Sequence, residues 1–119
     1  RVFHGTKCEH ADSINIYGLK ASTEGRLGPG IYLTVRDVAK QIAKYRGQGN
    51  EIYLIEVELD VGQMKVLPGS NDDRLGYWSA QGYDTCQSIH PAWIVNHPFP
   101  EWCVRDSSRL RIIGMQQIG

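Results

Sequence analysis

The sequence has no excess of charge of either sign, since its 119 residues include 13 Lys and Arg and 13 Asp and Glu. It therefore lacks the basic field that drives non-specific nucleic-acid binding through counterion release. It also lacks the polybasic segment that attracts a protein to an anionic membrane. No apolar run approaches the roughly 20 residues that a transmembrane helix needs. These absences argue against a DNA-wrapping protein and against a membrane partner, and they leave a local basic groove open.

Cysteine is scarce, and its arrangement is not that of a disulfide framework. Cys8, Cys86 and Cys103 are an odd, scattered set without a CxxC pair. This pattern favours reduced thiols in a cytoplasmic or nuclear protein. The sequence also contains neither GxGxxG after a strand nor GxxxxGK[ST], which argues against a nucleotide held in the Rossmann or P-loop manner.

The length and the composition, 41% hydrophobic and 22% charged, predict one compact domain over residues 1–119. We expect a monomer. Periodicity and turn residues predict two helices, early in the chain, and mostly antiparallel strands, a pattern typical of an α+β domain. The expected helices are 8–17 and 34–45, with a helical turn over 75–80. The expected strands are 2–3, 31–33, 51–59, 65–67, 83–89, 102–105 and 110–115.

Two of these elements carry detailed expectations. Thr34 with Asp37 resembles a capping box that opens the second helix, whose apolar residues Val38, Ile42 and Tyr45 share one face. The strand over 51–59 alternates clearly. It places Tyr53, Ile55, Val57 and Leu59 on one face and Glu56 and Glu58 on the other.

Three short segments offer side chains that could carry chemistry. His4 is followed directly by Gly5, so a polar imidazole lies beside backbone that a ligand can approach closely. In the segment 28–34, two glycines lie at the start of a strand and allow close packing of a flat ligand, and Tyr32 on that strand offers an aromatic face and a hydroxyl. Glu101 begins an otherwise apolar strand after two prolines. Each segment taken alone is as compatible with an ordinary strand end, turn or core residue.

Together and in this order, the segments resemble the His-Tyr-Glu signature of PARP-like ADP-ribosyltransferases of the diphtheria-toxin type. The resemblance is carried by His4-Gly5, by Gly30-Ile31-Tyr32 and by Glu101. It extends over segments 16–19, 28–33, 101–106 and 110–112. The segment 82–85 and the short loops most resemble the small virus-induced PARP-like proteins first described in fish.

This resemblance implies a split antiparallel sheet with short helices and a cleft for NAD, which is a co-substrate here, with no metal cofactor. His4 would bind the adenine ribose, and the Gly5 backbone would pair with the nicotinamide carboxamide. Thr6 completes this binding segment. The resemblance also assigns Tyr32 to the nicotinamide pocket and Tyr45 to stacking on the nicotinamide ring.

The same resemblance makes Glu101 the catalytic carboxylate, hydrogen-bonded to the 2′-hydroxyl of the nicotinamide ribose. Cleavage of the nicotinamide–ribose bond builds an oxocarbenium-like cation, and a fixed carboxylate stabilises charge that develops only in the transition state. His4 and Tyr32 would place the dinucleotide. The implied activity is mono-ADP-ribosylation with release of nicotinamide. The acceptor is expected to be a protein, and a nucleic-acid acceptor stays open.

One departure from the family pattern keeps an alternative open. The serine expected about one helical turn before the stacking tyrosine is absent, and Gln41 and Ile42 lie there instead. The alternative function is therefore a non-catalytic module that binds NAD or ADP-ribose, or an NAD hydrolase, on the same fold.

Other interpretations of single motifs are weaker. Residues 56–58 match the E-x-E of arginine-specific transferases, but alternating carboxylates on a strand are usually its solvated face. The start of the chain is also similar to RNA 2′-phosphotransferases, which rely on many basic contacts. Cys86, His90, His97 and Cys103 match no common zinc spacing, so we expect no metal site.

Overall fold

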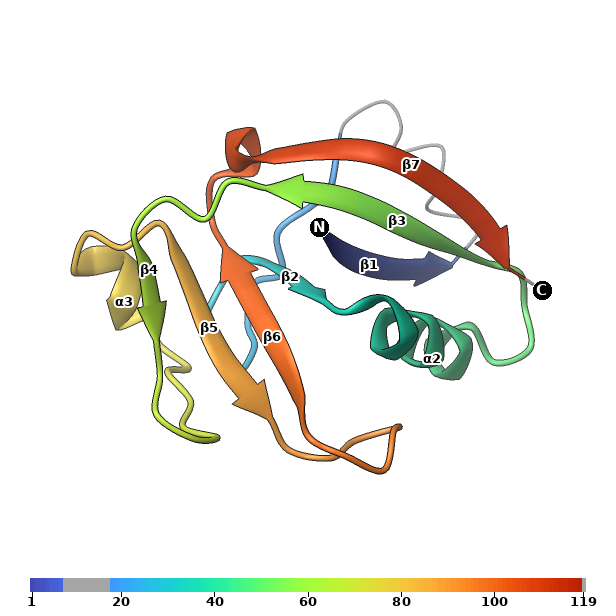
Figure 1. The fold of residues 1–119 in the computed structure, drawn as a ribbon, viewed down its shortest axis with the longest axis horizontal. Coiled ribbons are helices and arrows are strands. Elements are labelled where there is room, and N and C mark those ends of the chain that lie inside the picture. The colour runs from blue at the N-terminus through green and yellow to red at the C-terminus, as the bar shows by residue number, and fades with distance from the viewer. Residues whose placement is uncertain (8–17, 119) are drawn as a thin grey trace.

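A computed structural model describes residues 1–7 and 18–118, so the helix predicted over 8–17 lies outside the described residues. The described chain is a mixed α+β domain, as predicted, with one seven-stranded sheet (Figure 1). Among these residues no helix is long and apolar enough to cross a membrane. The strands are β1 (Val2–Lys7), β2 (Ile31–Thr34), β3 (Ile52–Leu59), β4 (Met64–Val66), β5 (Thr85–His90), β6 (Phe99–Val104) and β7 (Leu110–Ile118). The helices are α2 (Arg36–Gly47), the short α3 (Tyr77–Ala80) and the 3₁₀ turn η2 (Ser107–Arg109).

The order of the strands across the sheet is β4-β5-β6-β2-β1-β3-β7, and every pairing except β4 with β5 is antiparallel. The weak point of this sheet is the contact between β1 and β2. Their only Cα partners are Phe3 and Thr34, whereas β1 pairs with β3 along its whole length. Beyond that pair the sheet divides into two groups of strands, with α2 beside β1 (Figure 1).

Helix α2 differs from its predicted form. Val35, not Thr34, precedes it, and no side chain caps its first turn. The Thr34 hydroxyl instead donates a hydrogen bond to the Pro100 carbonyl at 2.7 Å, so the expected capping box is wrong because the cross-strand partner takes the cap side chain. The buried face of the helix consists of Val38, Ala39, Ala43 and Gly47. Tyr45, expected on that face, is 61% exposed.

Strand β3 confirms the predicted alternation and adds a second buried face. Ile55 and Val57 are fully buried in the main hydrophobic cluster. Ile52 and Leu54, on the opposite face, are buried as well, and β3 contacts α2. The sequence pattern of β3 did not predict the packing against α2, because only two residues of that face of the strand, Ile52 and Leu54, are apolar. A central strand covered on both sides fixes the position of its neighbour β1.

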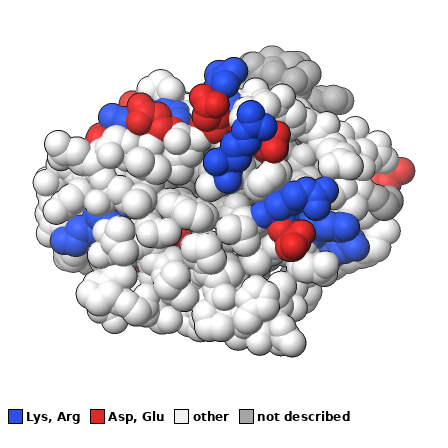
Figure 2. Space-filling model, in the orientation of Figure 1, with Lys and Arg blue, Asp and Glu red and all other residues white. Residues whose placement is uncertain are grey.

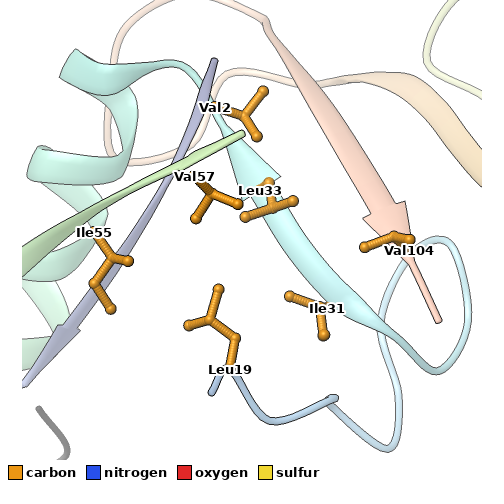
Figure 3. Packing of buried hydrophobic residues seen from close by; sticks show 7 residues of the cluster. All are labelled: Val2, Leu19, Ile31, Leu33, Ile55, Val57 and Val104. Atoms are coloured by element: carbon orange, nitrogen blue, oxygen red, sulfur yellow. The ribbon is translucent and has the colours of Figure 1, made fainter. Parts of the chain in front are cut away.

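The main cluster lies between the two groups of strands and ties them together (Figure 3). Its residues come from β1, the segment before β2, β2, β3 and β6, and they are Val2, Leu19, Ile31, Leu33, Ile55, Val57 and Val104. A second cluster consists of Leu27, Trp78, Cys86 and Cys103. Within it the Trp78 indole N–H donates to the Leu27 carbonyl at 2.7 Å, which ties the segment before β2 to helix α3.

The contact between β1 and α2 depends on Gly5. A Cβ at this position would lie 2.4 Å from the Ala39 carbonyl oxygen and 2.6 Å from the Ala43 Cβ. We expect Gly5→Ala to lower the free energy of unfolding by about 1–3 kcal/mol, because overpacking forces the helix away from the strand. Urea unfolding followed by circular dichroism measures the change.

Gly114→Ala is the matched control, because Gly114 also lies in a strand and a Cβ there meets nothing within 4 Å. Its effect should stay within about 0.5 kcal/mol, as for surface substitutions in general. Equal losses for the two variants would contradict a close approach of helix to strand at Gly5.

Candidate active site

A groove opens where β1 and β2 diverge. It has an outer part of about 460 Å³ and an inner recess of about 70 Å³. The two parts share five lining residues, which are His4, Tyr32, Arg46, Trp93 and Glu101. The outer volume lies in the range of small-molecule sites. The three residues predicted to carry the chemistry, His4, Tyr32 and Glu101, therefore meet in one groove. They lie far apart in the sequence, on the neighbouring strands β1, β2 and β6.

The position of Glu101 follows from strand pairing. Thr34 is its Cα partner on β2 and Ser88 its partner on β5, so Glu101 lies inside β6 and not at its start. The strand predicted over 102–105 starts three residues after the observed first residue of β6, Phe99, because Pro98 and Pro100 indicated a loop. Proline, however, is compatible with extended backbone and removes only one ladder donor. β6 therefore starts at Phe99, and Glu101 lies between two neighbouring strands.

His4 is held in a defined protonation state. Its Nδ1 lies 3.1 Å from the Tyr32 carbonyl oxygen, and because a carbonyl only accepts, Nδ1 carries the hydrogen. Burial lowers the pKa of His4, the hydrogen bond to Tyr32 opposes this, and Arg46 lowers the pKa further. The lowered pKa favours the neutral ring, and a neutral imidazole with its hydrogen on Nδ1 has an Nε2 that can accept a hydrogen bond.

The Tyr32 hydroxyl is occupied within the protein. It donates to the Gly28 carbonyl and accepts from the Leu27 N–H at 2.9 Å. Burial raises its pKa far above the usual value. Gly25 packs directly on the ring, since a Cβ there would lie 2.8 Å from the Cε1 atom. The Tyr32 hydroxyl therefore uses its hydrogen within the protein, where it orders the preceding loop, and Tyr32 lines both parts of the groove.

Glu101 faces a cation that the sequence did not reveal. Its Oε1 lies 3.8 Å from Nη1 of Arg26, and the two side chains are only 16% and 15% exposed. Burial raises the pKa of Glu101, while His90, Arg26 and Arg46 act to lower it. No motif marked Arg26, because it lies in a polar loop and meets Glu101 only through tertiary packing.

A second aromatic side chain in both parts of the groove, besides Tyr32, is Trp93, in the loop between β5 and β6. His90 stacks on its ring with centroids 5.7 Å apart, and the Arg46 guanidinium lies 5.7 Å from its centroid. Tyr45 lines neither part of the groove. Its ring meets the Trp93 ring edge-on, with the two ring centroids 6.0 Å apart. Tyr45 thus supports the groove from outside. Sequence reasoning missed Trp93, which lies in a loop without periodicity.

The two remaining predicted binding residues lie along β1. Gly5 lines the inner recess. Thr6 lies beyond it, in a separate hollow of about 190 Å³ together with Gly5, Lys7 and Arg46. This hollow follows the edge of β1 that β2 leaves unpaired, where backbone groups are available to a ligand.

The charge around the groove is uneven although the chain is neutral overall. Its outer part is lined by the cations Lys20, Arg26, Arg46 and Arg74, against the two carboxylates of Glu24 and Glu101. On the face seen in Figure 2, in contrast, positive and negative side chains alternate without a continuous patch. Cations outnumber carboxylates in this lining, and a cleft with an excess of one sign of charge attracts ligands of the opposite sign, so this part of the groove favours an anion.

The residues of the weaker interpretations lie elsewhere. Glu58 pairs with Arg111 at 3.0 Å, and Glu56 with Arg1 at 3.6 Å, both outside the groove. Cys86 and Cys103 are buried partners on β5 and β6. Within residues 1–7 and 18–118 no three His, Cys, Asp or Glu side chains are grouped to hold a metal ion.

A scan against protein-family models found no match for this chain, and a search of the curated proteins found none either. The family resemblance of the motifs therefore stays a prediction.

Tyr32→Phe should loosen the loop before β2 without changing the shape of the groove. The variant leaves the Leu27 N–H and the Gly28 carbonyl without their partner, so we expect a loss of about 1–3 kcal/mol in the free energy of unfolding. Tyr45→Phe, at an exposed position, is the control and should change stability by less than about 0.5 kcal/mol. Equal effects would show that the Tyr32 hydroxyl does not hold the loop.

Glu101→Gln should make the protein more stable at pH 7 and not at pH 4. Because the pKa of Glu101 is raised by folding, the native state loses stability as the pH rises above the unfolded pKa of roughly 4.3. Glutamine avoids that loss. Thermal midpoints of the two proteins measured from pH 4 to pH 8 should diverge as the pH rises.

Glu51→Gln, at an exposed position, controls for the removal of one negative charge. A Glu101→Gln midpoint below that of the unchanged protein at pH 7 would show that the attraction of the surrounding cations exceeds the cost of burial.

Proposed function

We propose that this protein is an NAD-dependent ADP-ribosyltransferase of the PARP-like kind, which transfers a single ADP-ribose to an acceptor and releases nicotinamide. The observation that carries the proposal is the position of Glu101. A largely buried carboxylate with an oxygen that has no hydrogen-bond partner among the described residues projects into the same groove as His4 and Tyr32. Carboxylates of this kind are costly to keep, and such cost is typical of functional sites.

The groove supplies the interactions that the reaction requires. The cations Lys20, Arg26, Arg46 and Arg74 suit the diphosphate of NAD, and the neutral His4 suits a ribose hydroxyl. Glu101 suits the cationic transition state, because a fixed carboxylate stabilises positive charge that appears at the ribose as the bond to nicotinamide breaks. As the carbon–nitrogen bond breaks and nicotinamide leaves with its electron pair, the acceptor nucleophile forms the new bond to the ribose carbon. Glu101 would orient this nucleophile, and the nucleophile's proton passes to the solvent.

The second candidate is a module that binds NAD or ADP-ribose without turnover, or an NAD hydrolase with water as the acceptor. Two observations favour it. Glu101 already faces the fixed cation of Arg26, and Tyr45, the residue expected to stack on nicotinamide, does not line the groove. We propose the transferase first because binding alone does not require a costly buried carboxylate, Glu101, in the same groove as His4. A cytoplasmic or nuclear monomer acting on a protein acceptor belongs to the same proposal, and a nucleic-acid acceptor stays open.

The test is incubation of the protein with NAD labelled in its adenosine half, following nicotinamide release and label on protein. Glu101→Gln should reduce both by about 10²–10³-fold, the effect of losing one group that stabilises the transition state. Glu58→Gln is the matched control, since Glu58 lies in a surface ion pair outside the groove, and it should keep full activity.

The outcomes separate the candidates. Release and labelling that disappear in Glu101→Gln support a transferase. Release without labelling, with the acceptors of a cell extract supplied, points to a hydrolase. Binding of NAD without release identifies the module, and loss of activity in Glu58→Gln alone would move the site to the E-x-E motif.

A further inference from the structure

A second imidazole lies beside Glu101 in the groove. His90 lines the outer part together with His4 and Glu101. His90, at the end of β5, has Phe99 as its Cα partner on β6, two residues before Glu101. His90 and Glu101 are therefore diagonal neighbours on one face of the sheet, about 7–8 Å apart between their Cα atoms, a separation that long and ring side chains can span. A ring that can take up a proton thus adjoins the carboxylate that would orient the acceptor.

The protein fixes the orientation of the His90 ring. The ring stacks on Phe99 with centroids 4.7 Å apart and planes 8° apart, and on Trp93 with centroids 5.7 Å apart. Its Nδ1 lies 2.6 Å from the Pro91 carbonyl oxygen, and because a carbonyl only accepts, Nδ1 carries the hydrogen. In the neutral ring Nε2 then keeps the lone pair that takes up a proton. A base that is oriented by a third group is the arrangement that activates a nucleophile.

Charge also links His90 to Glu101. Burial raises the pKa of Glu101, and among the charges that oppose this effect His90 acts more strongly than Arg26 or Arg46. The electrostatic effect of a nearby charge falls with distance. The imidazole and the carboxylate are therefore close enough to act on one acceptor atom placed between them.

Neither Glu101 nor His4 is suited to take the proton of the acceptor. Protonation of Glu101 would remove the negative charge that stabilises the cation at the ribose. Burial lowers the pKa of His4 despite its hydrogen bond to Tyr32, so this ring takes up a proton weakly. His90 is only partly buried and lines the wider, outer part of the groove, which is the part open to an acceptor.

A base at this place restricts the chemical class of the acceptor. A carboxylate acceptor has no proton to lose at pH 7, and a thiol gives up its proton far more readily than a hydroxyl does. An amine acceptor is positively charged at pH 7, and the cations Arg26, Arg46 and Arg74 of the groove repel it. A hydroxyl is neutral and must lose its proton as it attacks, so it is the acceptor that a general base serves.

We propose that His90 is the general base of the transfer and that the acceptor is a hydroxyl group of a protein. This inference rests on the proposed function. As the ribose–nicotinamide bond breaks, its electron pair leaves with nicotinamide, and a lone pair of the hydroxyl oxygen forms the new bond to the ribose carbon. The O–H bond breaks, its electron pair stays on the oxygen, and the proton moves to Nε2 of His90. The imidazolium, whose Nδ1 still donates to Pro91, then releases the proton to the solvent.

The experiment measures single-turnover transfer of labelled ADP-ribose from NAD to the proteins of a cell extract, by His90→Ala and by His90→Phe. His90→Phe keeps an aromatic ring against Phe99 and Trp93 and removes the base, so it also serves where His90→Ala does not fold. Each variant should lose about 10²–10⁴-fold in rate, the usual contribution of general acid–base catalysis. Its dissociation constant for a non-hydrolysable carbocyclic NAD analogue, measured by calorimetry, should stay within a few-fold of that of the unchanged protein.

His97→Ala is the matched control. The Nδ1 of His97 likewise lies close to the carbonyl oxygen of the following proline, Pro98, at 2.9 Å, but His97 lines neither part of the groove. This variant should keep the full rate of transfer.

Imidazole added to His90→Ala should restore part of the lost rate, because it supplies a base in the space that the side chain leaves. Pyrazole, a ring of the same size and a much weaker base, should not. Mass spectrometry of the labelled proteins identifies the acceptor. Label on serine, threonine or tyrosine supports the inference, whereas label on a carboxylate, an amine or a thiol, or on nucleic acid instead of protein, would overturn the hydroxyl of a protein as the acceptor.

The failures are distinguishable. Full transfer by both His90 variants would overturn the inference and leave the proposed function intact. A loss in His90→Ala that imidazole restores no better than pyrazole would also overturn it, and it would make His90 a packing residue of the groove. If the unchanged protein releases no nicotinamide from NAD, the proposed function fails and this inference fails with it.

Discussion

The structure depends on the short pairing of β1 with β2, which share a single pair of Cα partners. If these strands paired along their length, the sheet would be continuous and the groove would not exist. Pairing ends after Phe3 and Thr34 because β1 is held elsewhere, by the full ladder to β3 and by α2 packed on Gly5. His4 therefore lies at the point where the sheet divides. Its imidazole meets the Tyr32 carbonyl there, in the place of a further ladder bond.

The groove is kept open at a cost that the rest of the molecule offsets. Arg26 and Glu101 are largely removed from water, and burial of charge is unfavourable unless the charges are paired and hydrogen-bonded. The loop that carries Arg26 is fixed by the Tyr32 hydroxyl and by Trp78 below it. These contacts hold the loop with its charged group in place, which is the preorganisation a binding or catalytic site needs.

The sequence predicted what depends on local pattern or on a fixed set of residue types. The alternation in β3 and the α+β character follow from local pattern, whereas the resemblance of three short motifs to a known signature led us to expect His4, Tyr32 and Glu101 in one cleft, and all three line the groove. It missed what depends on distant packing. Thr34 resembled a helix cap but bonds across the sheet to Pro100, prolines hid the start of β6, and Arg26 and Trp93 lie in loops whose course is set by the sheet.

The ionisation of Glu101 links the two candidate functions. Burial favours its neutral form, and the cations around it favour the carboxylate. A ligand that brings positive charge into the groove adds to the second effect, because each additional nearby cation lowers the pKa of a carboxyl group. The nicotinamide ring of NAD carries such a charge and ADP-ribose does not. By linkage, NAD would therefore bind more tightly to the ionised form that catalysis needs, and the departure of neutral nicotinamide would remove that effect and favour release of the product.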